Sequence, residues 1–94
     1  MNKIRIIARI DINNGNASIL SGIGTIPDMY FVHSYVCHPK DKSIISSTTE
    51  YGGIEFCSSF QENNIYGCQF HPEKSSKKGL KILENFLEIS RGIL

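Results

Sequence analysis

The sequence predicts an α/β fold in which a mostly antiparallel sheet is followed by one C-terminal helix. Short segments rich in aromatic and β-branched residues recur between residues 29 and 70, and turn-forming residues separate them. From residue 80 onward, apolar residues recur at steps of three and four instead, which is the period of an amphipathic helix. The change of period indicates where the sheet ends and the helix begins.

The composition indicates one small globular domain or a piece of a larger one. The chain has 94 residues, of which 40% are hydrophobic and 20% are charged. Ten basic and nine acidic residues give a net charge of +1, so we expect no nucleic-acid partner and no membrane partner. No apolar run approaches the roughly 18 residues of a membrane span.

The cysteine content and the N-terminal pattern predict a cytoplasmic location. Charged residues interrupt the first apolar stretch, which is unlike a signal peptide. Three cysteines, an odd number, then favour reduced thiols over a disulfide framework.

The first predicted strand covers residues 4–12. Apolar residues occupy every second position from Ile4 to Ile12, and charged residues occupy most of the others, with Ile7 as the exception. This alternation is typical of a half-buried strand. Asparagines and a glycine at residues 13–16 end the strand, and residues 21–28 are expected to form a connector.

Four further strands are expected, at residues 29–37, 43–51, 54–60 and 65–70. The Gly52-Gly53 pair suits a tight turn between the second and third of these, since glycine adopts positive φ at little cost.

The helix is expected at residues 77–90, packed on one face of the sheet. Ser75 or Ser76 is a candidate cap for its start, and Gly92 follows its end. The apolar stripe of this helix consists of Leu80, Ile82, Leu83, Phe86, Leu87 and Ile89.

The segment between the last strand and the helix contains the candidate catalytic residues. His71 and Glu73 are two residues apart with Pro72 between them, so both can project the same way from extended backbone. A carboxylate that binds one imidazole nitrogen fixes the tautomer and leaves the other nitrogen free as a general base. On spacing alone, a surface histidine beside a solvated glutamate is the more ordinary interpretation.

Four stretches, covering about residues 19–89, together resemble the class I glutamine amidotransferases, and most closely the glutaminase subunits of imidazole glycerol phosphate synthase. They are residues 30–35 (YFVHSY), 48–53 (TTEYGG), 67–75 (GCQFHPEKS) and 79–87 (GLKILENFL). The resemblance implies that residues 19–94 are the C-terminal part of a flavodoxin-like, doubly wound domain. It also implies hydrolysis of glutamine to supply ammonia for histidine biosynthesis, with the cyclase subunit as partner and no cofactor.

By the same resemblance, His71 is the base of a Cys-His-Glu triad, Glu73 orients it, and Lys74 lies at the interface with the cyclase subunit. The family's nucleophile lies in a Gly-x-Cys-x-Gly turn, and no such motif occurs in this sequence. Cys68 falls within a predicted strand and is expected to face away from His71. The chain alone is therefore expected to be inactive. The alternatives are a non-catalytic remnant or interaction module, and an amidotransferase of a surface-sugar pathway.

Residues 1–18 are expected to form an extra N-terminal strand and turn. Arg5, Ile6 and Ile7, with Asp11 and Gly15, resemble the first strand of the partner cyclase subunit, a (β/α)8 barrel in which the matching aspartate is catalytic. This would make the chain a join between two genes near residues 14–19. A generic strand with a solvated aspartate is the more ordinary interpretation, and one strand cannot form a barrel.

Other polar residues give weaker signals. Cys68 and His71 have ligand-like spacing, but no Cys-x-x-Cys pair accompanies them, so we expect no metal site. Four lysines near the helix start suit either a solvated face or a partner contact. His33 and Tyr35 are interpreted as packing or site-lining residues, and Tyr51 as a turn-packing aromatic.

Overall fold

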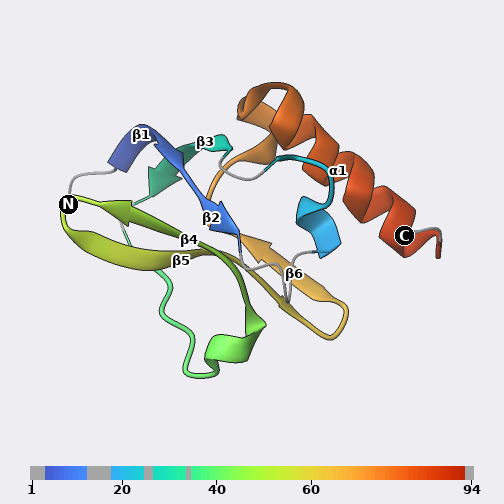
Figure 1. Ribbon diagram of the computed structural model, residues 1–94, viewed down its shortest axis with the longest axis horizontal. Coiled ribbons are helices and arrows are strands. Elements are labelled where there is room, and N and C mark those ends of the chain that lie inside the picture. The colour runs from blue at the N-terminus through green and yellow to red at the C-terminus, as the bar shows by residue number, and fades with distance from the viewer. Residues whose placement is uncertain (1–3, 13–17, 25–26, 34, 93–94) are drawn as a thin grey trace.

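The chain forms two antiparallel sheets and one long helix in the computed structural model, which describes residues 4–12, 18–24, 27–33 and 35–92 (Figure 1). The smaller sheet pairs β1 (Ile4–Arg9) with β3 (Asp28–His33). The larger sheet has the order β2-β4-β5-β6, made of β2 (Asp11–Ile12), β4 (Ile45–Tyr51), β5 (Ile54–Glu62) and β6 (Ile65–Cys68). The helix α1 (Ser76–Ser90) follows. The predicted class, an antiparallel sheet with a C-terminal helix, is confirmed.

The predicted first strand is divided at Ile10 and connects the two sheets. Its first part, β1, pairs with β3, and its second part, β2, pairs with β4. Between them, Ile10 is fully buried and its N–H donates to the carbonyl oxygen of Pro27 at 3.0 Å. The predicted turn at residues 13–16 lies outside the described residues.

The expectation of one sheet over residues 29–70 is corrected to two sheets. β3 pairs with β1 rather than with β4, and it ends at His33 instead of continuing to Cys37. Tyr35 lies in a bend outside any strand, and Cys37 instead forms an isolated bridge to Cys57 of the larger sheet. The two sheets stay in contact through an isolated bridge between Phe31 and Phe70.

Two tight turns connect the strands of the larger sheet. Gly52 and Gly53, with φ of 60° and 79°, join β4 to β5 as the glycine pair predicted. Asn63, with φ of 56°, lies in the turn between β5 and β6, where asparagine tolerates the left-handed region better than most residues.

The hydrophobic core lies between the two sheets and the helix. Phe31 is at its centre, with its ring edge-on to Phe56 and to Phe70 at centroid distances of 5.8 Å each. The other buried members are Ile10, Ile19, Leu20, Ile23, Met29 and Ile82.

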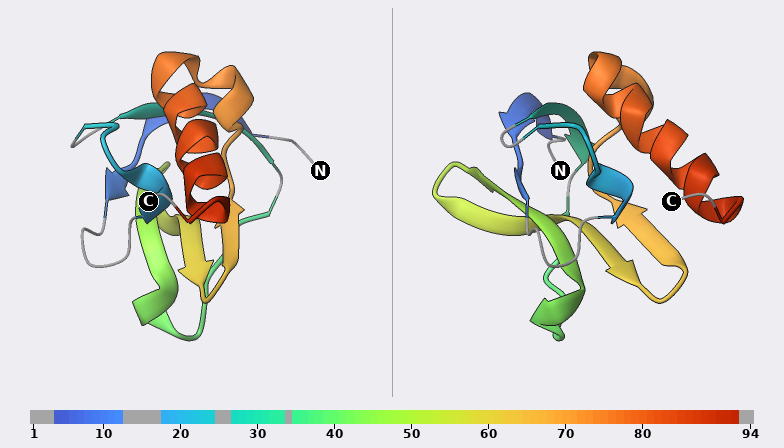
Figure 2. Two further views of the ribbon diagram at one scale, coloured as in Figure 1. Left: turned by 90° about the vertical axis from the view of Figure 1, so that its right-hand side faces the viewer. Right: turned by 45° about the vertical axis from the view of Figure 1, so that its right-hand side comes forward.

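The helix α1 contacts the rest of the chain through three buried residues, one small, one apolar and one polar. Its buried residues are Gly79, Ile82 and Asn85. The Asn85 side-chain amide donates to the carbonyl oxygens of Ile19 at 2.9 Å and Ser21 at 2.7 Å, which anchors the helix to the 3₁₀-helix η1 (Ser18–Leu20) and the residue after it. Figure 2 shows α1 running along the side of the molecule next to η1.

Most of the predicted apolar stripe of α1 faces solvent. Ile82 is buried and Ile89 packs partly against the core. Four other large side chains of the stripe are between 42% and 56% exposed, namely Leu80, Leu83, Phe86 and Leu87. The helix is rotated so that Gly79, Ile82 and Asn85, rather than the leucines, are buried. The half-exposed Phe86 ring still packs edge-on against Tyr66 of β6, at a centroid distance of 5.8 Å. None of the helices within the described ranges has the length and hydropathy of a membrane-crossing segment.

Candidate functional site

The candidate site is built where the chain passes from the larger sheet to the smaller one. After β6, the Gln69 N–H still donates to the carbonyl oxygen of Ser58 in β5 at 2.8 Å. Phe70 then enters the core, and the His71 N–H donates to the carbonyl oxygen of Tyr30 in β3, also at 2.8 Å. The backbone of His71 is therefore fixed on β3.

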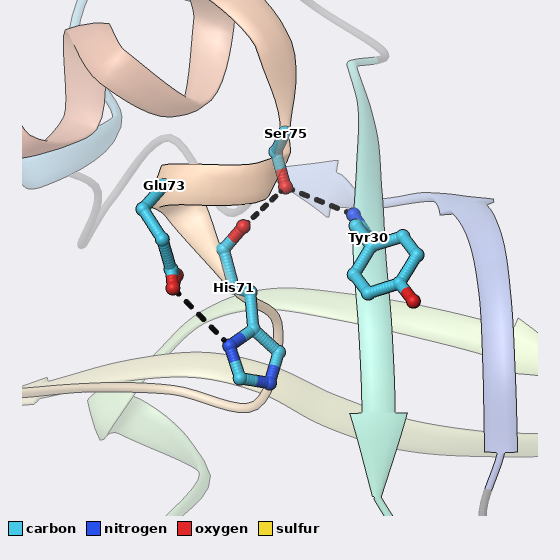
Figure 3. Close-up of polar contacts among 4 residues, drawn as sticks. All are labelled: Tyr30, His71, Glu73 and Ser75. Carbon is cyan, nitrogen blue, oxygen red and sulfur yellow. Dashed lines mark hydrogen bonds and ion pairs between the residues drawn. The ribbon is translucent and has the colours of Figure 1, made fainter.

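The structure brings His71 and Glu73 together as the spacing predicts. His71 has extended backbone (φ −101°, ψ 99°), and Pro72 starts the 3₁₀-helix η3 (Pro72–Lys74). This turn places the His71 Nδ1 atom 3.3 Å from Glu73 Oε2 (Figure 3). The two side chains are 40% and 54% exposed, so the contact orients the ring rather than contributing much to stability. Within the described residues, the other ring nitrogen, Nε2, makes no hydrogen bond.

Ser75 has a role at this site that sequence analysis missed. It was a candidate helix cap, but its hydroxyl makes no capping bond. Instead, Ser75 Oγ donates to the His71 carbonyl oxygen at 2.6 Å and accepts from the Tyr30 N–H at 2.9 Å. Figure 3 shows the hydroxyl on one side of the His71 backbone and the imidazole on the other. The hydroxyl thus closes a ring of hydrogen bonds around the His71 peptide.

An aromatic and a cationic side chain lie beside the histidine. The Tyr30 ring is edge-on to the His71 ring at a centroid distance of 6.3 Å. The Lys74 ammonium lies 5.8 Å from the centroid of the same Tyr30 ring, within the range of a cation–π contact. Tyr30, His71, Glu73 and Lys74 therefore form one accessible cluster.

The three cysteines gather elsewhere. Cys37, Cys57 and Cys68 line a cavity of about 130 Å³, which Ser58 and Gln69 also line. Burial raises the pKa of the Cys57 thiol to about 11, which keeps it protonated at neutral pH. In the described part of the chain, no hydrogen bond connects any of these thiols to the His71 imidazole. The structure thus supplies a candidate base without a thiol beside it.

The remaining candidates are dispersed. His33 packs edge-on against Phe31 and Phe56, and its Nδ1 atom lies 2.8 Å from the Tyr35 carbonyl oxygen. Its Nε2 atom is buried and has no hydrogen-bond partner among the described residues. Asp11 is exposed on β2, opposite Thr48 of β4. The Tyr51 side chain is 48% exposed at its turn rather than packed. Of the lysines, Lys81 forms an ion pair with Glu84 at 3.3 Å. Among residues 4–12, 18–24, 27–33 and 35–92, no three potential metal ligands cluster.

Comparison with known proteins defines the class to which this fold and site belong. The sequence pattern of the family described as "Glutamine amidotransferase class-I" matches residues 2–89. The chain therefore belongs to the class I glutamine amidotransferase family, as the four motif stretches predicted.

The similar curated proteins are subunits of imidazole glycerol phosphate synthase. Over 73 residues the chain is 55% identical to "Imidazole glycerol phosphate synthase subunit HisH" of Pelagibacter ubique (strain HTCC1062), covering 78% of this chain and 35% of that protein. The subunit of the same name from Moorella thermoacetica is 49% identical over 79% of this chain and 35% of its own length. That of Pyrococcus furiosus is 60% identical over 61% of this chain and 29% of its own length. The chain thus spans about a third of the length of these relatives.

Proposed function

We propose that this chain is the C-terminal part of a glutaminase subunit that supplies ammonia to imidazole glycerol phosphate synthase in histidine biosynthesis. The observation that carries the proposal is the contact between His71 and Glu73, held on fixed backbone within the stretch GCQFHPEKS. The names of the similar proteins favour histidine biosynthesis over a surface-sugar pathway.

In this function His71 is the general base. Glu73 accepts a hydrogen bond from Nδ1–H, which leaves Nε2 unprotonated and able to take the proton of a thiol. The resulting thiolate attacks the side-chain amide carbon of glutamine, and the imidazolium returns the proton to the departing ammonia. Water then hydrolyses the thioester to glutamate. Glu73 orients the ring and transfers no proton itself.

The thiol for this reaction comes from outside the chain described here. The three cysteines line the cavity at β5 and β6, and within the described residues none of them forms a hydrogen bond with the His71 imidazole, so none is proposed as the nucleophile. The isolated chain is accordingly inactive, and a second function, as a non-catalytic interaction module, fits its exposed helix face. That face is formed by Leu80, Leu83, Phe86 and Leu87.

Partner and location follow from the same proposal. Lys74 is exposed beside the histidine and lies at the contact with the cyclase subunit, in a heterodimer. The complete assembly works in the cytoplasm.

Complementation tests the proposal directly. The full chain is co-expressed with the N-terminal part of a related glutaminase that carries a Gly-x-Cys-x-Gly turn, in the presence of the cyclase subunit, and glutamate release is measured. We expect turnover that falls about 100-fold or more in His71→Ala, because the base is lost. Lys77→Ala, an exposed change on α1, is the matched control and should leave turnover unchanged. A stable complex whose turnover is insensitive to His71→Ala would contradict the proposal.

A further inference from the structure

Three thiols converge at one edge of β5, outside the candidate catalytic site. Cys37 lies directly opposite Cys57 in an isolated antiparallel bridge, and the Cys57 N–H donates to the Cys37 carbonyl oxygen at 3.1 Å. Cys68 is opposite Ser59, two residues further along β5 than Cys57, and so lies on the same face of the sheet. All three line the cavity of about 130 Å³ described above.

The pairing of Cys37 with Cys57 gives the Cα spacing that a disulfide requires. Residues that form a hydrogen-bonded antiparallel pair have Cα atoms about 5.5 Å apart. This separation lies within the roughly 4.4–6.8 Å that disulfides span. Burial and then the neighbouring Cys37 thiol raise the pKa of Cys57, and desolvation and then Cys57 raise the pKa of Cys68, so Cys57 has a thiol neighbour on either side and the strand register distinguishes them. Cys68 is a diagonal neighbour of Cys57 and therefore a poorer partner.

We propose that Cys37 and Cys57 form a reversible disulfide by exchange with a small disulfide of the glutathione class. Cys37 is half-buried and Cys68 is exposed, but only Cys37 has a second thiol directly opposite it. The Cys37 thiolate attacks one sulfur of oxidised glutathione, forms a mixed disulfide and releases one molecule of reduced glutathione. The buried Cys57 then attacks the Cys37 sulfur as a thiolate and releases the second molecule. Two protein thiols are oxidised, one small disulfide is reduced to two thiols, and the two protons pass to the released glutathione.

The link would tie the segment after β3 to the middle of β5 and close a loop that contains β4. A cross-link of this kind restricts the unfolded chain, so the midpoint of thermal unfolding should rise by about 10 °C or more. This inference does not depend on the proposed glutaminase function.

The experiment uses the full chain, purified in the reduced state and incubated over a series of glutathione redox ratios. After acid quenching and alkylation, trypsin separates Cys37 from Cys57 at Lys40 and Lys42. A glutamate-specific protease then separates Cys57 from Cys68 at Glu62. We expect one cross-linked peptide pair joining Cys37 to Cys57, formed equally in Cys68→Ser and reversed by excess reduced glutathione.

The variants distinguish the proposed exchange from its competitors. In Cys57→Ala, the mixed disulfide on Cys37 should persist, because the thiol that resolves it is gone. Oxidation that yields mainly a link between Cys57 and Cys68, adducts confined to Cys68, or links between chains would overturn the proposal. Failure to oxidise at ratios that fully oxidise an unfolded control of the same chain would overturn it too.

Discussion

Replacing Ser75 with alanine should lower the free energy of unfolding by about 2–3 kcal/mol. The Ser75 hydroxyl is buried, with the residue 6% exposed, and it makes two hydrogen bonds, to the His71 carbonyl oxygen and to the Tyr30 N–H. Each contributes about 1 kcal/mol net, and a buried donor left without a partner adds a further penalty of about 1 kcal/mol. For a domain of this size, the loss corresponds to a fall of about 10 °C or more in the unfolding midpoint.

The assay is urea unfolding followed by circular dichroism, with Ser90→Ala as a matched control. Ser90 also donates from its hydroxyl to a backbone carbonyl, that of Leu87 at 2.7 Å, but it is exposed at the end of α1. Its loss should cost less than about 0.5 kcal/mol because water replaces the hydrogen bond. Equal destabilisation by the two changes would refute the argument that Ser75 fixes the His71 backbone.

Three other changes test separate parts of the structure. Gly79→Ala should lower the free energy of unfolding by about 2 kcal/mol, although alanine favours helix, because the added Cβ would overlap the Pro72 carbonyl oxygen. An unchanged urea midpoint would contradict this. Raising the pH should destabilise the wild type more than it destabilises Cys57→Ala. The measurement is the difference between the urea midpoints of the two proteins at each pH. The Cys57 pKa is about 11 in the folded chain, mainly through burial, so the stability due to this thiol is complete below its ordinary value of 9.0 and is lost between pH 9 and 11. A constant difference over that range would count against the assigned burial. Finally, the chain should self-associate in sedimentation experiments, and Leu83→Lys should weaken the association because Leu83 belongs to the exposed apolar face. A monomer with a cooperative thermal unfolding transition above about 65 °C would contradict this.

Local chemistry explains why several elements were predictable from the sequence. Gly52 and Gly53 both have positive φ, the conformation that a two-residue hairpin turn requires and that glycine permits. The predicted helix, residues 77–90, differs from α1 by one residue at its start and ends at the same residue. Both its periodicity and the terminating Gly92 are local signals. Similarly, the contact between His71 and Glu73 depends only on a two-residue spacing across a proline.

The features that sequence analysis missed depend on residues far apart in the chain. Ile10 divides a continuous alternating pattern because its N–H pairs with Pro27, which no local period encodes. Periodicity located the apolar stripe of α1, but not its rotation, which Asn85 determines through two bonds to the segment around η1. Ser75 resembled a cap because serine caps many helices, whereas its partner Tyr30 lies 45 positions away.

The polar anchoring of α1 has a consequence for whatever covers its exposed face. Hydrogen bonds are directional, so the two bonds from Asn85 fix the rotation of the helix about its own axis, which hydrophobic burial alone would leave adjustable. Leu83 and Leu87 are consequently presented in a set direction before any second surface arrives. A surface that docks there meets a preorganised template, and its binding free energy is not reduced by the entropy of ordering the helix.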